Sequence, residues 1–410
     1  MKQSKLIRTS TVAMSLDFLL KGQLAFLNQY FEVIAVSGDD EHLNIVAERE
    51  KVKTASVPMQ RIISPLKDLV SLWKLYWLFK KEQPLIVHSI TPKAGLLSMT
   101  AAKLACVPIR IHTFTGLIFP SKKGILQRLL IVMDRVLCYC ATHIYPEGKG
   151  VKKDLIRYKI TSKPLKVIAN GNVNGIDTSY FSKEQVSFQE QQTLKKELGI
   201  AENDFVFVFV GRLVGDKGIN ELVQAFKQLV VSLSGVENSS IKNQTKLLLV
   251  GPLESDLNPL QEETLREIET NKNVISVGFQ KEVRSYFAIA DCLVFPSYRE
   301  GFPNVVLQAG AMGLPAIVTD INGSNEIIMD GENGIIIPSK NTIALQKAMS
   351  KMMNEEVFYN ELQQNSRKMI VAKYEQKVVW QAILEEYRKL EVRSLENRRQ
   401  FSITNKTREN

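Results

Sequence analysis

At 410 residues, with 45% hydrophobic and 23% charged side chains, the chain is globular and too long for one ordinary core. These values predict two domains and exclude a disordered or fibrous protein. The formal charge of +10 is uneven, because residues 1–180 hold 26 Lys and Arg against 13 Asp and Glu, while the remainder holds 27 against 30. A basic first half predicts that one half of the protein meets an anionic surface or substrate.

The cysteines and the apolar stretches bear on the compartment. The four cysteines show neither the paired spacing of a metal site nor a dense disulfide pattern, so we expect reduced thiols. No basic flank, long apolar run and small-residue cleavage site occur together near the N-terminus, which predicts no signal peptide. The most apolar helical stretch, 124–141, contains three charged residues, Arg128, Asp134 and Arg135, and is not expected to span a bilayer. A cytoplasmic protein is therefore predicted.

Short apolar runs alternate with helix-length segments along both halves, which indicates parallel α/β sheets. In the first half the predicted strands are 31–37, 85–89, 109–113, 143–145 and 165–168. In the second half they are 205–210, 246–250, 274–277, 292–295, 316–319 and 334–337, with helices that include 220–232, 260–269 and 304–312. Right-handed crossovers then give two Rossmann-like, doubly wound domains in tandem.

Turn residues cluster at 170–182, and we place the domain break there. Residues 1–178 are predicted to form one Rossmann-like domain and residues 179–375 a second. A last helix, 376–390, carries apolar residues on one side, and we expect it to pack back on the first domain. Residues 391–410 are polar with little periodicity and are predicted to be a tail.

The segment GRLVGDKG, 211–218, directly follows an all-apolar predicted strand and precedes a helix. Ligands of open parallel sheets bind just beyond the carboxyl ends of the strands, where this loop must lie. Its glycines let the backbone approach a ligand closely, and Arg212 and Lys217 supply two cations that suit a diphosphate. The loop is neither a Walker loop nor a dinucleotide fingerprint. The alternative is a basic surface turn with incidental glycines.

The segment PSYREGFPNVVLQAGAMGLP, 296–315, leads from a predicted strand through a loop into a helix that begins near Asn304. The free amides and positive dipole end of that helix favour a phosphate. Glu300 in the loop suits sugar hydroxyls, although an acid near a first turn is also an ordinary helix cap. A third polar segment, 320–326, again follows a strand. Three polar loops at strand ends of one sheet indicate a ligand site rather than packing alone.

These segments resemble the carboxyl-terminal half of family 4 glycosyltransferases of the GT-B fold, and the resemblance extends over nearly the whole chain. The G-R-L…K-G loop, the P-S…E-G-F-P loop and the N-G-S-N-E-I-I segment occur in the expected order and spacing. The resemblance implies two domains that face each other across a cleft. It also implies a nucleotide-diphosphate sugar as donor, expected to be a UDP-sugar such as a UDP-N-acetylhexosamine or a UDP-hexose.

The resemblance assigns roles to individual residues. It gives Arg212 and Lys217 to the donor diphosphate and Glu300 to the donor sugar. Gln308 stands where the family usually has a second glutamate that holds the ribose, so the charge-assisted bond is lost there. The expected catalytic residues are Glu300, His112, Arg212 and Lys217. The expected donor-binding residues are Gly211, Arg212, Lys217, Phe279, Glu300, Gly301, Phe302, Pro303, Asn304, Gln308 and Glu326.

The first half resembles the family less strongly. His112, in the segment 109–117, resembles the family position from which a histidine projects toward the donor sugar; without that match, a lone histidine beside a strand is more often structural. Residues 20–23 replace the Gly-Gly loop that the family has near its amino terminus. The segment 146–155 resembles sugar transferases that work on bacterial surface polysaccharides.

The mechanism that the resemblance implies retains the anomeric configuration, with attack from the side that the diphosphate leaves. Arg212, Lys217 and the helix start at Asn304 are expected to stabilise the departing nucleotide diphosphate. No Asp-x-Asp motif follows a predicted strand, and we expect neither a metal nor another cofactor.

The segment 66–82 predicts an amphipathic helix. Its apolar residues form a broad stripe, with lysines at the edge: Leu66, Leu69, Val70, Leu72, Trp73, Leu75, Tyr76, Trp77 and Phe79, beside Lys67, Lys74 and Lys81. A tryptophan-rich stripe of this kind suits a membrane interface, although a helix packed between a sheet and a neighbour gives the same pattern. A lipid-linked (polyprenyl diphosphate) saccharide acceptor would explain both the stripe and the basic first half. We therefore expect peripheral contact with the inner face of the cytoplasmic membrane, a role in capsule, O-antigen or related glycan synthesis, and no nucleic-acid partner.

Two other functions fit the same fold. A nucleotide-sugar epimerase would share the diphosphate loop but release a free sugar without any acceptor. A non-catalytic nucleotide-sugar-binding protein would bind without turnover.

Overall fold

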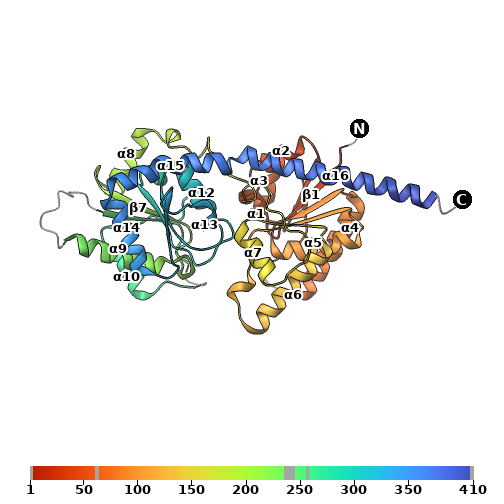
Figure 1. Cartoon of the computed structure of the whole chain (residues 1–410), viewed down its shortest axis with the longest axis horizontal. Helices are drawn as coiled ribbons and strands as arrows, with labels where there is room; N and C mark the ends of the chain where they lie inside the picture. The colour runs from red at the N-terminus through yellow and green to blue at the C-terminus, as the bar shows by residue number, and fades with distance from the viewer. Residues whose placement is uncertain (1–2, 61–63, 235–244, 255–257, 407–410) are drawn as a thin grey trace. The chain divides into compact units, whose positions relative to one another are not determined.

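The computed structural model describes residues 3–60, 64–234, 245–254 and 258–406, with the backbone alone over 233–234 and 397–406. The chain forms two compact units, one made of Met1–Gly175 with Gln376–Asn410, and the other of Ile176–Glu375. Each unit contains a six-stranded parallel sheet with helices on both faces (Figure 1). The predicted pair of Rossmann-like α/β domains is confirmed.

The sheet of the first unit has the strand order β3-β2-β1-β4-β5-β6. Its strands are β1 (Lys5–Thr9), β2 (Glu32–Ser37), β3 (Lys53–Ser56), β4 (Ile86–Ser89), β5 (Ile109–Phe114) and β6 (His143–Pro146). Successive side chains point to opposite faces, so Leu6 packs in one core cluster and Ile7 in the other. Because both faces are covered, the strands are apolar on both sides.

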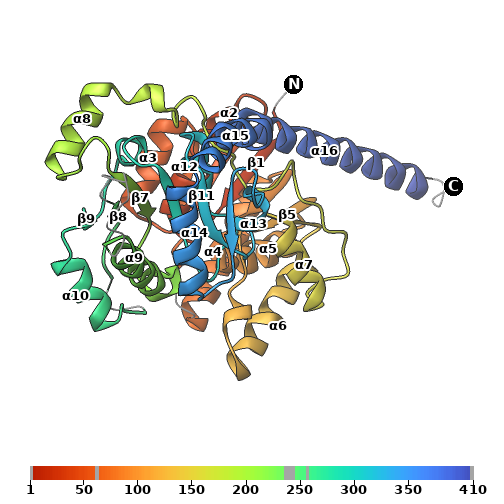
Figure 2. The same cartoon turned by 60° about the vertical axis from the view of Figure 1, so that its left-hand side comes forward.

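Two helix layers cover this sheet. One layer holds α1 (Ala13–Leu19), α2 (Gln23–Asn28), α3 (Glu41–Glu50) and the carboxyl-terminal helix α16 (Gln376–Lys406). The other holds α4 (Pro65–Glu82), α5 (Pro92–Leu104), α6 (Gly124–Cys140) and α7 (Lys149–Arg157). A short 3-10 turn, η1 (Phe119–Ser121), comes just before α6. Figure 2 shows α4, α5, α6 and α7 apart from α2 and α16. None of the helices in the described ranges is long and apolar enough to cross a bilayer.

The sheet of the second unit has the order β12-β11-β10-β7-β8-β9. Its strands are β7 (Phe205–Val210), β8 (Thr245–Val250), β9 (Val274–Ser276), β10 (Cys292–Phe295), β11 (Ala316–Thr319) and β12 (Gly334–Ile337). Its helices are α8 (Phe188–Glu197), α9 (Ile219–Ser234), α10 (Glu262–Thr270), α11 (Arg284–Ala288), α12 (Asn304–Ala311), α13 (Ser324–Ile327), α14 (Thr342–Asn354) and α15 (Glu356–Tyr374), with 3-10 turns η2 (Lys183–Gln185) and η3 (Gly215–Lys217). The strand order reverses between β7 and β10, and ligands of such sheets bind beyond the carboxyl ends of the two strands at that switch point.

Several predicted elements differ from the observed ones. The stretch 165–168 is not a strand, since Leu165 forms only an isolated bridge with Ile144. Two strands of the first sheet, β1 and β3, were not predicted. The prediction of a tail from residue 391 is wrong as far as Lys406, because α16 continues through it. That segment contains neither glycine nor proline and is rich in helix-forming residues. Residues 407–410 lie outside the described part of the chain.

The helix α16 supplies part of the core of the first unit. Its buried side chains are Val379, Ile383, Leu384, Tyr387 and Leu390. The boundary between the units falls between Gly175 and Ile176, where the sequence suggested residue 178. The two ends of the chain therefore build one unit together.

Candidate functional site

The loops that follow β7 and β10 meet at the switch point of the second sheet. Gly218 has a φ of +73°, and a Cβ there would lie 2.2 Å from the carbonyl oxygen of Pro296. The backbone N–H of Tyr298 donates to the carbonyl of Asp216 at 2.9 Å. Only glycine allows this approach, so Gly218 lets the 211–218 loop pack directly against the loop that follows β10.

Lys217 and Glu300 form an ion pair in which each side chain is 17% exposed. The hydroxyl of Ser297 also donates to Glu300 Oε1 at 2.7 Å, and Lys217 Nζ lies 5.6 Å from the centroid of the Phe295 ring. The structure thus brings together the two residues that the sequence assigned to one site. In this state the cation of Lys217 is neutralised by Glu300.

Arg212 lies on the same loop and is also paired. Its Nη1 atom donates to Glu254 Oε2 at 2.9 Å. The side chains of Arg212 and Glu254 are 46% and 34% exposed. Glu254 follows β8, and no motif in the sequence marks it. Its only sequence signal is its place just beyond the carboxyl end of a strand next to β7.

The helix α12 begins directly after the Glu300 loop. Pro303 occupies its N-cap position, and no side chain in the described part of the protein caps the helix start. Within this first turn, Val306 N–H donates to the carbonyl of Pro303 at 3.1 Å, and the helix start carries the positive end of the helix dipole. Gln308 lies one turn further, half-buried, and its side chain makes no hydrogen bond to another described residue. Phe302 is buried and packs 5.6 Å from the ring of Tyr374, so its ring belongs to the core rather than to a ligand site.

The third polar loop packs against the second. A Cβ on Gly323 would lie 2.4 Å from the carbonyl oxygen of Gly301, which places the 320–326 segment directly beside the Glu300 loop. Glu326 is half-buried on α13, and its carbonyl accepts from the hydroxyl of Tyr374 at 2.9 Å. Phe279, beyond β9, is 66% exposed. Across the described ranges, no three His, Cys, Asp or Glu side chains gather as a candidate metal site.

His112 is not open to a ligand in this structure. It is 1% exposed within β5, its Nδ1 lies 2.8 Å from the hydroxyl of Ser89, and its ring packs edge-on against Phe114. A Cβ on Gly95 of α5 would lie 2.5 Å from its Cε1 atom. Burial lowers the pKa of His112 to about 3, so the ring is neutral. Its Nε2 atom is also buried and has no hydrogen-bond partner among the described residues. The catalytic role that the sequence suggested for His112 stays a prediction.

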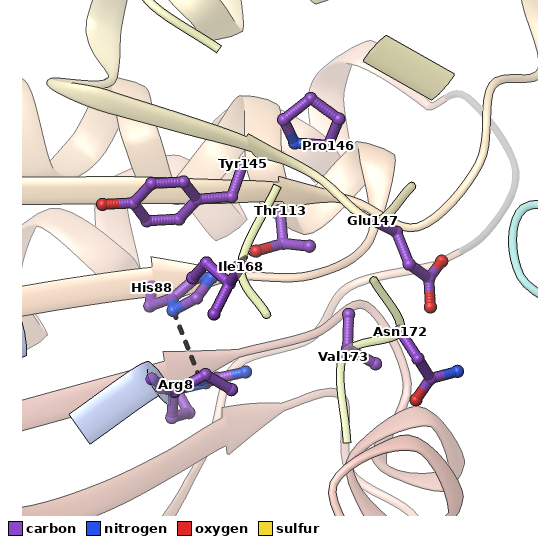
Figure 3. Close-up of a pocket in the computed structure, with 10 residues that line it drawn as sticks. Arg8, His88, Thr113, Tyr145, Pro146, Glu147, Ile168, Asn172 and Val173 are labelled. Carbon is purple, nitrogen blue, oxygen red and sulfur yellow. Dashed lines mark hydrogen bonds between the residues drawn. The ribbon is translucent and has the colours of Figure 1, made fainter. Parts of the chain in front are cut away.

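A second buried polar cluster, in the first unit, was not found from the sequence. Figure 3 shows Arg8, His88, Thr113 and Tyr145, from four neighbouring strands, around a cavity of about 20 Å³, which has room for about one water molecule. Arg8 Nη1 donates to the hydroxyl of Tyr387 on α16 at 2.7 Å and lies 3.2 Å from His88 Nδ1. Burial, and then the charge of Arg8, hold the pKa of His88 well below its usual range. The cluster joins α16 to the sheet and therefore has a structural role.

Two family descriptions match the chain. The model "Glycosyltransferase Family 4" matches residues 21–178, and the model "Glycosyl transferases group 1" matches residues 190–369. A capsular polysaccharide biosynthesis glycosyltransferase, CapM, of Staphylococcus aureus is 32% identical over 385 residues, which cover 93% of this chain and 96% of CapM. The chain is a family 4 glycosyltransferase.

Other relatives of this glycosyltransferase agree with that membership. An Escherichia coli enzyme named UDP-Gal:alpha-D-GlcNAc-diphosphoundecaprenol alpha-1,3-galactosyltransferase is 29% identical over 84% of this chain and 85% of its own length. Among solved structures, Anabaena Alr3699/HepE in complex with UDP-glucose has a TM-score of 0.77 at 17% identity, over 94% of this chain and all of HepE. At that identity, the similarity to HepE supports the fold.

Proposed function

We propose that this glycosyltransferase transfers a hexose or an N-acetylhexosamine from a UDP-sugar to a polyprenyl-diphosphate-linked saccharide, with retention of the anomeric configuration. The product would serve capsule, O-antigen or related glycan synthesis. The observation that carries this proposal is the pairing of Lys217 with Glu300 at the switch point of the second sheet, on the loop that also carries Arg212. The names of the S. aureus and E. coli relatives support the glycan and the lipid-linked acceptor.

In the proposed mechanism, Arg212, Lys217 and the positive dipole end of α12 at Asn304 stabilise the charge that develops on the leaving diphosphate. The diphosphate draws Lys217 away from Glu300, and the freed carboxylate then accepts hydrogen bonds from the donor sugar. Donor binding therefore prepares the group that recognises the sugar. The acceptor hydroxyl attacks C1 from the face that the diphosphate leaves, without a covalent enzyme intermediate. The bond from C1 to the diphosphate oxygen breaks as the new glycosidic bond forms, and the hydroxyl proton passes to the departing diphosphate.

The remaining donor contacts follow from the loops. The backbone at Gly211 and Gly301 approaches the diphosphate and sugar, while Gln308 hydrogen-bonds the ribose. Phe279, after β9, and Glu326, on α13 after β11, lie beyond the carboxyl ends of strands of the same sheet and border the nucleotide. Phe302 and Pro303 act through the backbone that they position, since both side chains are buried.

The function is tested by incubating the enzyme with labelled UDP-sugars and membranes that carry lipid-linked saccharides. We expect label in the lipid fraction, and the same anomeric configuration in product and donor by NMR. Free altered sugar without an acceptor would indicate an epimerase. Donor binding with no product of either kind would indicate a binding protein.

Activity is expected to survive chelation. The cations of Arg212 and Lys217 already neutralise the diphosphate in the proposed complex, so a divalent ion has no charge to supply there. Transfer should proceed at the same rate in EDTA as in buffer. Complete loss of transfer that magnesium or manganese restores would contradict this assignment of the site.

Gln308 gives a test of the ribose contact. Replacing Gln308 with leucine keeps the bulk but leaves a ribose hydroxyl unpaired, so UDP should bind about fivefold more weakly, or ~1 kcal/mol. Gln308→Glu should bind UDP at least as tightly as the wild type, because a carboxylate accepts stronger hydrogen bonds than an amide. Calorimetric titration with free UDP measures both. If Gln308→Leu binds UDP like the wild type, the residue is only helix surface.

Membrane contact is proposed for the outer face of α4. Its inner side is core, with Ser71, Leu75 and Phe79 buried, so the helix satisfies both interpretations of its sequence. The outer face exposes five apolar side chains: Leu66, Leu69, Val70, Trp73 and Trp77. Lys67 and Lys74 lie exposed along it. An exposed apolar face with tryptophan and lysine fits the surface of an anionic bilayer.

The helix α6, in the same layer, adds a second exposed stripe. Its members recur every three or four residues: Ile125, Leu129, Val132, Val136 and Tyr139. Arg128 and Arg135 are the exposed charges beside them, whereas Asp134 is half-buried and desolvation raises its pKa to about 7. Two such helices would repel a second copy of themselves but attract anionic lipids. These features support our proposal that the enzyme works at the inner face of the cytoplasmic membrane.

A further inference from the structure

The arginine of the diphosphate loop is held by a carboxylate that belongs to none of the three donor loops. Arg212 Nη1 and Glu254 Oε2 lie 2.9 Å apart, and both side chains remain substantially exposed. Glu254 comes from the segment after β8, which neighbours β7 in the sheet. The pair therefore lies at the same edge of the sheet as Lys217 and Glu300, but it is open to solvent.

The backbone register places Glu254 diagonally across from Arg212, on the same face of the two paired segments. Gly211 N–H donates to the carbonyl of Val250 at 2.9 Å, and Leu213 N–H donates to that of Pro252 at 2.8 Å. Leu213 and Leu253 then form a parallel bridge. The two chain segments run side by side past the ends of their strands, so the carboxylate is built into the position that faces the guanidinium.

A carboxylate and a phosphate compete for a guanidinium group because both offer paired oxygens that accept its N–H groups. Arg212 stays charged whichever anion it holds. An ion pair this exposed contributes little net free energy, so a diphosphate exchanges with it at small cost. The exchange lowers nucleotide affinity without preventing binding.

We propose that Glu254 is a competing anion that occupies Arg212 in the ligand-free enzyme and is displaced when the donor diphosphate binds. After transfer, Glu254 recaptures Arg212 and so favours release of the nucleoside diphosphate product. The residue thereby tunes nucleotide affinity without touching the sugar. This inference rests on the proposed role of Arg212 as a diphosphate contact.

The test is calorimetric titration of free UDP into the full-length protein. Glu254→Gln should bind UDP roughly two- to fivefold more tightly than the wild type at low ionic strength, which is the range of an exposed ion pair. The gain should shrink at about 0.5 M salt, where exposed charges are screened. Glu269→Gln, which removes an exposed carboxylate from α10, is the matched control and should leave UDP affinity unchanged. Glu254→Ala provides a second variant, and thermal melting checks that each is folded.

Arg212→Gln separates the two proposals. It should weaken UDP binding by about tenfold, because the site loses a charge-assisted contact. Added to it, Glu254→Gln should give no further gain. If Arg212→Gln weakens binding while both Glu254 variants bind UDP no more tightly than the wild type, Glu254 is not a competitor. An equal gain in Glu269→Gln would also overturn the inference. If Arg212→Gln binds UDP like the wild type, the diphosphate role itself fails.

Discussion

Replacing Lys217 with methionine is expected to lower kcat by roughly a hundredfold, equivalent to about 3 kcal/mol of transition-state stabilisation. The charge on the leaving diphosphate grows as the glycosidic bond breaks, and Lys217 would meet it from a site that is 17% exposed, where screening by water is weak. Affinity for free UDP should also fall, because UDP carries in full the negative charge that develops on the leaving diphosphate. Steady-state kinetics with a UDP-sugar, together with UDP titration, measure both effects.

Lys351→Met is the matched control for this substitution. Lys351 lies on α14, pairs with Glu355 and stands 3.8 Å over the ring of Phe358, so it loses the same kinds of contact as Lys217. Its kcat should equal that of the wild type. Wild-type turnover in Lys217→Met, at both saturating and limiting donor, would remove the lysine from the mechanism.

The two sides of α4 should respond in opposite ways to substitution. Phe79 is 1% exposed in the core, and Phe79→Ser is expected to cost about 4 kcal/mol of unfolding free energy, because it leaves a cavity and buries a hydroxyl. Trp73 and Trp77 are 63% and 53% exposed, so the double change to serine should alter stability by less than about 1 kcal/mol. That double variant should nevertheless bind anionic vesicles about a hundredfold more weakly.

Denaturant unfolding and vesicle sedimentation distinguish these outcomes. Changing all three residues together would not separate the two effects, because loss of Phe79 alone is expected to destabilise the core beneath α4. If the Trp73 and Trp77 variant unfolds, the outer face of α4 is packed in the native protein. If it stays folded and still binds vesicles like the wild type, membrane contact is made elsewhere.

The second sheet was predictable because its strands are short apolar runs bounded by glycine and proline, as in β7 and β10. The first sheet was harder. Its central strand β1 contains Arg8, which reads as a surface residue in the sequence but is 1% exposed and held by Tyr387, some 380 positions away. The edge strand β3, KTAS, has no apolar run at all. Long-range pairing, rather than local pattern, made both of these strands.

The residues of the candidate site also divide into those that a local sequence pattern marks and those that it does not. Lys217, Glu300 and the α12 start were found because each lies in a punctuated loop directly after a strand. Glu254 was missed because its significance comes only from the bridge between Leu213 and Leu253, which no local spacing reveals. The burial of His112 could not be predicted, because the family position does not report exposure and the glycine that packs against its ring, Gly95, lies on another element.

Arg8 and His88 anchor α16 to the first sheet, and this contact determines the order in which the two units can complete their cores during synthesis of the chain. Residues 1–175 emerge first from the ribosome, yet their sheet lacks the cover of Tyr387 and Ile383 until more than 200 further residues have been made. The second unit, contained entirely within Ile176–Glu375, has all its core residues before α16 is translated. The first unit of the nascent chain would thus be the last to complete its fold. Its sheet would stay accessible to chaperones until α16 has been made.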